Sequence, residues 1–344
     1  MKRWGKTLLS GALAAAMSLL YRLDVSAEDL TLAENAVDLV EDEQCQPKTY
    51  PNALGVYMPD GISLFEVEGV TYLVTANEGD SREWGEEGSE YANEKKVTLT
   101  ASDETQAEKV RALDKEFTTV LQEGKEYLFG TRSFAIYNAE TMEQVYESGN
   151  EFEARTAEYL PQWFNCSNDD LTMDNRSAKK GPEPESVVVG TVGDKVLAFV
   201  ALERIGGLMV YDVTSPAKAE YVNYINTRDF SGEIAGDTAP EGLSFLNLDG
   251  KPMVLAACEV SGTVAAYAVE EGSSTPAAQQ VMGQEPAGSA PSDALNGEET
   301  PPESAQQNQD VSNPSPVIGL VLVAVLAAVL CGLAVYKAKK SKEK

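Results

Sequence analysis

The chain has 344 residues, with 55 acidic against 27 basic side chains and no histidine, so its formal net charge is −28. A surface this acidic repels nucleic acid and anionic lipid, because both carry dense negative charge themselves. The absence of histidine excludes Ser-His-Asp and Cys-His catalysis and histidine-ligated zinc. The length allows one large domain or two ordinary ones.

The chain begins like an export signal. Basic residues within positions 2–6 precede an apolar run over residues 7–20, and residues 25–27 resemble a small-residue cleavage site. We therefore expect residues 1–27 to be a signal peptide. An uncleaved anchor is the alternative, because the spacer at residues 21–24 is long and polar.

One pattern then occurs three times: a proline, an acid, a small residue and an aliphatic residue, starting at Pro59, Pro184 and Pro240. Such self-similarity is typical of a repeat architecture. Each copy has two apolar runs around a glycine-containing turn, which predicts a β-hairpin. A further run follows in the second and third copies, and residues 221–225 predict an outer fourth strand for the second unit.

Each copy carries a second acid 18 positions after the first, and these six acids form our candidate site. If each turn lies midway between its two acids, the pair faces across the open end of a hairpin, where like charges repel. A cation such as Ca²⁺ would relieve the repulsion through oxygen ligands. Pairing with arginines and simple exposure to water are the alternatives. The candidate residues are Asp60 and Glu78, Glu185 and Glu203, and Glu241 and Glu259.

Residues 102–122 are expected to form an inserted helix. Val110, Leu113 and Phe117 recur on one helical face, and Ser102 stands where an N-cap would be. The sequence therefore predicts one helix among the strands.

The next segments predict a hairpin and a loop. Residues 127–137 and 144–147 are apolar runs around a turn, which suggests another hairpin. Residues 148–180 have no regular pattern and are rich in polar and aromatic side chains. This indicates a long loop that is either functional or an ordinary connection.

The composition changes after residue 270. Residues 271–316 are rich in proline, serine, glutamine and acids and lack aromatic residues, which predicts a flexible stalk. Residues 317–336 carry no charge and are long enough to cross a bilayer as a helix. The lysine-rich residues 337–344 follow at once, so the positive-inside rule predicts a cytoplasmic tail and an extracellular domain over residues 28–270.

Four cysteines leave the disulfide question open. Cys331 lies in the expected span, and Cys258 lies in a predicted strand. Cys45 and Cys166 either pair in an oxidising compartment or stay, like Cys258, as free thiols.

Five motifs occur in a fixed order between residues 55 and 270: MPDGISLFEVEGVTYLVTANEGDSRE, LFGTRSFAIYN, KKGPEPESVVVG, ALERIGGLMVYDVTSP and GDTAPEGLSF. Together they resemble the bacterial choice-of-anchor I family, which is also similar to mesenchyme-specific cell-surface glycoprotein. The resemblance implies a seven-bladed, YVTN/WD40-like β-propeller that is exported and held at the cell surface by a C-terminal anchor. Ala178 stands where the family commonly has aspartate, so one carboxylate of any borrowed metal site is missing.

The resemblance also implies that the N-terminal blades are missing, because members carry more blades before the first motif than fit here. The expected fold is therefore all-β. It is a partial β-propeller of four-stranded antiparallel blades with one inserted helix, followed by a C-terminal transmembrane helix.

We expect a non-catalytic binding or scaffold protein anchored at the cell membrane, with a partner chain completing the propeller and no nucleic acid. The alternative is a metal-dependent, phosphoesterase-like hydrolase, or an accessory to one, although no nucleophile or base is recognisable. Arginines that would meet a phosphate are Arg82, Arg132, Arg176 and Arg204. A third possibility is an inert fragment of a longer ancestor.

Overall fold

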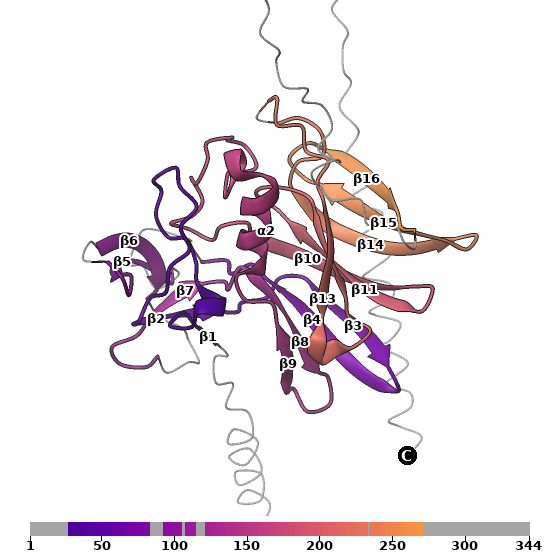
Figure 1. The fold of residues 1–344 in the computed structure, drawn as a ribbon, viewed down its shortest axis with the longest axis horizontal. Coiled ribbons are helices and arrows are strands. Elements are labelled where there is room, and N and C mark those ends of the chain that lie inside the picture. The colour runs from indigo at the N-terminus through magenta and orange to yellow at the C-terminus, as the bar shows by residue number, and fades with distance from the viewer. Residues whose placement is uncertain (1–26, 83–91, 105–106, 115–120, 233, 271–344) are drawn as a thin grey trace, which may run out of the picture. The chain divides into compact units, whose positions relative to one another are not determined.

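The computed structural model describes residues 27–82, 92–104, 107–114, 121–232 and 234–270 (Figure 1). The predicted stalk, transmembrane span and tail, and all of the predicted signal peptide except Ala27, lie outside these ranges. Within the ranges, no helix is long and apolar enough to cross a membrane.

The three repeat copies form three antiparallel sheets, one after another along the chain. The first sheet has strand order β3-β4-β8-β9 (Ile62–Val67, Val70–Asn77, Ser133–Asn138, Gln144–Glu147). The second has order β10-β11-β12-β13 (Pro184–Val192, Lys195–Leu202, Leu208–Asp212, Glu220–Ile225). The third has order β14-β15-β16 (Pro240–Leu248, Lys251–Cys258, Thr263–Ala268).

Two smaller sheets and a few short helices accompany them. A three-stranded sheet has order β1-β2-β7 (Ala27–Asp29, Ala53–Val56, Glu126–Phe129), and β5 pairs with β6 (Glu94–Thr100, Ala107–Leu113). Helix α2 and three 3-10 turns, η1 to η3, connect the strands (Glu151–Tyr159, Ala33–Asn35, Pro161–Trp163, Pro216–Lys218).

The three repeat hairpins are confirmed as β3–β4, β10–β11 and β14–β15. The run expected over residues 127–137 is divided: Ser133–Asn138 pairs with Gln144–Glu147, but Glu126–Phe129 pairs in parallel with β2. Glu68 and Gly69 both have positive φ (52° and 79°), as do Asp249 and Gly250 (53° and 79°). Two consecutive positive φ values define the type I′ turn that matches strand twist. The fourth strand at Glu220–Ile225 is also present.

The sheets pack face to face in chain order, and their first strands β3, β10 and β14 lie side by side (Figure 1). Phe65 and Val74 of the first sheet share one buried cluster with Val200 of the second. On the other face of the second sheet, Phe199 packs against Phe245 of the third, with ring centroids 6.1 Å apart. Burial of these apolar faces stabilises the series.

The predicted helix over residues 102–122 is wrong where the structure describes it. Ala107–Leu113 is strand β6, paired with β5, and Val110 and Ala112 alternate into the core. Ser102 caps nothing; its backbone and hydroxyl groups both donate to the Thr49 carbonyl. The helix occurs instead at Glu151–Tyr159, inside the stretch predicted to be irregular.

Two buried arginines hold the long segment after α2 in place. Arg132 donates to the carbonyls of Asp38 (2.7 Å) and Ser177 (2.6 Å) and pairs with Glu153. Arg228 donates to the carbonyls of Ser167 and Arg204, each at 2.8 Å. Backbone carbonyls without helix or sheet partners are thus satisfied by charged donors, which lets an irregular segment be buried.

The three described cysteines are reduced. Cys45, Cys166 and Cys258 are free thiols, so the Cys45–Cys166 pairing does not form. Cys166 is buried and accepts a hydrogen bond from Arg228 at 3.6 Å. Burial raises the pKa of its thiol to about 11, which disfavours the reactive thiolate.

Candidate functional site

The repeated acids stand at the open ends of their hairpins, as the sequence predicts. In the second copy, for example, Pro184 pairs with Leu202, so Glu185 and Glu203 flank the last strand pair. The residue before each repeated proline has a left-handed backbone, with φ of 40° at Met58, 52° at Glu183 and 58° at Ala239. Non-glycine residues seldom adopt this conformation, so its recurrence marks the same bend in every copy.

Four of the six candidate acids gather around the first two sheets. Carboxylate oxygens of Asp60, Glu78 and Glu185 lie within 4.8 Å of one another. Glu78 also forms a second such group with Glu203 and with Glu183, which the sequence analysis did not select.

The third pair stands apart from both groups. Glu241 and Glu259 share a hydrogen bond with each other instead. The structure therefore joins the first two copies of the site more closely than the third.

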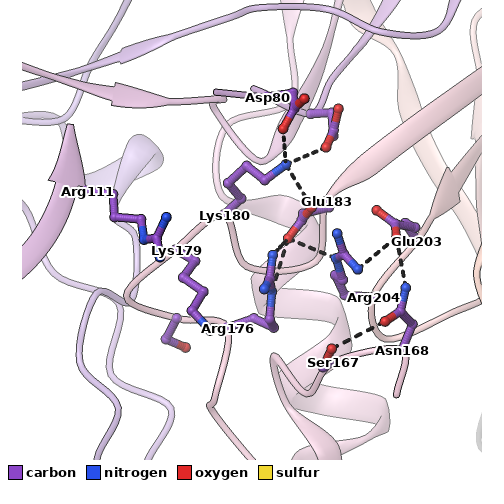
Figure 2. Close-up of polar contacts among 12 residues, drawn as sticks. Asp80, Arg111, Ser167, Asn168, Arg176, Lys179, Lys180, Glu183, Glu203 and Arg204 are labelled. Carbon is purple, nitrogen blue, oxygen red and sulfur yellow. Dashed lines mark hydrogen bonds and ion pairs between the residues drawn. The ribbon is translucent and has the colours of Figure 1, made fainter. Parts of the chain in front are cut away.

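Glu183 is the centre of an ion network (Figure 2). Its side chain is fully buried and meets three cations: Arg176, Arg204 (Nε to Oε1, 3.0 Å) and Lys180 (Nζ to Oε2, 2.9 Å). Burial alone would raise the pKa of Glu183, but attraction by Lys180, Arg176 and Arg204 lowers it to about 2. Glu183 therefore stays ionised and anchors the three cations.

The same cations reach the repeated acids. Lys180 pairs with Glu78, and Arg204 pairs with Glu203 (Nη1 to Oε1, 2.9 Å). Glu203 also accepts a hydrogen bond from the Asn168 amide at 2.8 Å. Pairing of the acids with arginine, one of the alternatives from the sequence, is thus confirmed for Arg204.

Glu185, Glu203 and Glu241 bind protons unusually tightly. Burial, a hydrogen bond that the protonated Glu185 donates to Asp60, and the charge of Glu78 raise the pKa of Glu185 to about 9. Burial raises the pKa of Glu203 to about 7 against the attraction of Arg204. Burial and Glu259 raise the pKa of Glu241 to about 7. Crowded carboxyl groups of this kind gain from a shared proton or a cation.

Among the described acids of these two groups, only the pair Asp60 and Glu185 is free to bind an added cation. Glu78 and Glu203 already have cations from the protein, whereas Asp60 and Glu185 face each other without one. Ca²⁺ takes six to eight oxygen ligands, so these carboxylates would supply only part of its shell. The calcium site expected at the six repeated acids, here called the calcium rim, stays a prediction and is restricted to Asp60 and Glu185.

The sequence analysis missed Glu183, Lys180 and Asn168 as parts of the site. The signal for the first two was present, because the KKGPEPE motif adds an acid directly before the repeated proline and two lysines before that. No sequence pattern pointed to Asn168, because it reaches Glu203 only through the path that its buried loop takes in the folded protein.

Fold and site together define a repeat-built, all-β protein whose ion network joins successive sheets. Residues 24–216 match the choice-of-anchor I domain, and the chain belongs to this family.

Two relatives were compared. The chain is 29% identical to Gigasin-3a of Magallana gigas over 164 residues, which is 42% of this chain and 58% of the relative. It is also 29% identical to mesenchyme-specific cell surface glycoprotein of Strongylocentrotus purpuratus over 100 residues, 25% of this chain and 13% of the relative. The matches thus span less than two thirds of either relative's length.

Proposed function

We propose that this protein is a non-catalytic binding scaffold at the cell surface. In this proposal the three sheets are blades of a partial β-propeller, and a second copy of the chain covers the open blade faces. The family, the cell-surface relative and the predicted signal and span support the location. The observation that carries the binding role is the uncovered outer face of the third sheet.

That face repeats a buried one. Pro240 lies 56 positions after Pro184, so the residues of β10 to β12 in the second sheet have equivalents 56 positions later in the third sheet. The residues of these strands that pack on the third sheet have their equivalents on the outer face of the third sheet. Phe199 thereby corresponds to Leu255, and Leu208 corresponds to Val264. In the second sheet Leu208 is fully buried, whereas Val264 is 68% exposed. No described element covers this face.

The matching half of the contact lies at the other end of the series. The third sheet docks on the second through Phe245, and the same repeat offsets map Phe245 onto Leu64 of the first sheet. Leu64 is 62% exposed and its neighbour Ile62 is 57% exposed. One chain therefore presents both halves of its own sheet-to-sheet contact, which suits head-to-tail pairing of two copies.

The hydrolase alternative is less well supported than the scaffold. Glu78 and Glu203, which would hold its metal, are paired with Lys180 and Arg204. A propeller-like fold by itself supports many unrelated functions.

The test is the mass of the full-length chain in detergent, by light scattering, with and without Val264→Asp. The charge disrupts an apolar contact but leaves the exposed strand folded, so we expect an assembly for the natural chain and a monomer for the variant. Met142→Asp is the matched control, since Met142 is 61% exposed at a turn away from the face. A monomeric natural chain, or equal masses for both variants, would contradict the proposal.

A further inference from the structure

Five basic side chains line one cavity beside the ion network, in a chain whose acids outnumber its bases two to one. The cavity has a volume of about 440 Å³. Its lining residues are Asp80, Ser81, Glu94, Arg111, Phe129, Arg176, Lys179, Lys180 and Arg204. We propose that this cavity binds a tetrahedral oxyanion, a phosphate or sulfate group carried by a small molecule or glycan.

Ion pairs to buried acids hold the basic side chains of the cavity wall in place. Arg176, Lys180 and Arg204 converge on the single buried carboxylate of Glu183. Lys180 also pairs with Glu78 and Asp80, and Arg204 pairs with Glu203, whose pKa burial raises to about 7, so near neutral pH these acids offset much of the positive charge of the wall. The buried side chains fix the cations before any ligand arrives, which lowers the entropy lost on binding.

The donor geometry leaves hydrogen-bonding capacity for a ligand. Arg176 donates to Glu183 through Nε and Nη2, and Arg204 uses Nε and Nη1 for Glu183 and Glu203. A guanidinium has five N–H donors in a planar fork, which suits the oxygens of phosphate or sulfate. Cations around the wall favour a compact, multiply charged anion over a single carboxylate.

Lys179 is the most accessible member of the cation set. Its side chain is exposed and forms no ion pair with a described carboxylate, in contrast to the adjacent Lys180. Figure 2 shows it beside Arg111 and Arg176. Lys179 therefore contributes a charge for the ligand that the fold does not need for itself.

The remaining lining suggests how the rest of a ligand would sit. Ser81 supplies a hydroxyl, which donates to Glu94 at 3.0 Å, and Phe129 supplies an apolar wall. A volume of this size accommodates an anionic group together with a sugar-sized body.

The test uses the full-length chain in detergent at pH 7, titrated with inorganic phosphate and, separately, with sulfate. Thermal unfolding and calorimetry report binding, and sodium chloride at equal ionic strength is the reference. We expect a saturable rise in melting temperature above the chloride reference, because the ions bind the folded state. Response to both ions indicates a general oxyanion site, and response to phosphate alone indicates a phosphate site; either supports the proposal.

Two test variants and one control variant show whether the binding is specific to the cavity. Lys179→Glu should weaken binding about tenfold or more, as expected for loss of one charge-assisted contact. Lys218→Glu is the matched control, because Lys218 is equally exposed but lies on η3 outside the cavity. Arg176→Lys keeps the charge and removes the fork, so it should also weaken binding.

A response no larger than that to chloride would overturn the proposal. Equal losses in Lys179→Glu and Lys218→Glu would do the same, because they would show only a general effect of charge. Val264→Asp should leave phosphate binding unchanged, so a failure of self-association and a failure of the oxyanion site are separable.

Discussion

At the scale of single residues, Glu183 organises the site more than any of the repeated acids does. Among the described residues it is the one carboxylate that meets three cations, and its side chain is fully buried. Removing one partner of a buried ion network leaves the others uncompensated, which costs far more than a surface pair is worth.

Glu183→Gln should therefore destabilise the protein by about 3 kcal/mol or more. The amide keeps the volume but cannot neutralise Arg176, Lys180 and Arg204. Glu66→Gln, an exposed position on β3, is the control and should change little. Chemical denaturation measures both, and equal stabilities would show that the network is dispensable.

The raised pKa of Glu185 predicts that the stability of the protein depends on pH. Its pKa rises from the ordinary 4.5 to about 9, so the folded state keeps a proton that the unfolded chain releases between these values. The free energy of unfolding must then fall as pH rises from about 4.5 to 9. Glu185→Gln, which stays neutral, should flatten this slope and stabilise the protein at pH 8. An unchanged slope from thermal melts at pH 5 to 9 would rule out this carboxyl as its source.

The same position tests the predicted calcium rim. Millimolar Ca²⁺ at pH 8 should replace the shared proton between Asp60 and Glu185 and raise the melting temperature, and EDTA should reverse the rise. Glu185→Gln should abolish the effect. If Ca²⁺ does not change the melting temperature of the natural chain, the prediction of a calcium site at Asp60 and Glu185 is wrong.

At the scale of elements, a close backbone crossing connects β4 to the segment between β7 and β8. Gly79 and Gly130 both have positive φ (85° and 71°), and a Cβ on Gly79 would lie 1.8 Å from the Gly130 nitrogen. This crossing sets the position of Glu78 at one side and Phe129 at the other.

Gly79→Ala should cost at least about 3 kcal/mol, because backbone atoms must move apart. Gly250→Ala shares the positive φ (79°) but meets nothing within 4 Å, so it should cost only about 1 kcal/mol. Denaturation midpoints of the two variants give the comparison. Similar costs would mean that conformation, rather than the crossing, dominates.

The elements also show what the sequence can and cannot predict. The hairpins were predictable because turn residues and apolar alternation agreed, as at Glu68-Gly69. The error at residues 107–113 arose because Val110 and Leu113 fit a helical spacing while Val110 and Ala112 fit an alternating one. Pairing with β5, which is a tertiary contact, decided between them.

Helix α2 had the opposite problem. It buries Glu153 and Thr156 beside Phe152, so it has little apolar periodicity to detect. Its position depends on Arg132, which lies 21 residues earlier and pairs with Glu153. Of the six repeated acids, four come together in the structure, and their protein cations were only partly foreseen.

At the scale of the whole molecule, the three large sheets form a series with exposed apolar side chains at both ends, Ile62 and Leu64 on the first sheet and Val264 on the third. The two internal contacts join equivalent faces of successive repeat copies, which start at Pro59, Pro184 and Pro240. A series of this kind gains stability from each covered face, so its ends are where a partner adds most.

The most direct test of head-to-tail pairing is a cross-link between two differently tagged full-length copies. The repeat maps the Phe199–Phe245 contact onto Leu255 of one copy and Leu64 of the other. One copy would carry Leu64→Cys and the other Leu255→Cys, with a short thiol-specific cross-linker. Met142→Cys in place of Leu64→Cys is the control. We predict a cross-linked product carrying both tags for the Leu64–Leu255 combination and little for the control; no product, or equal yields, would contradict a scaffold completed by its own second copy.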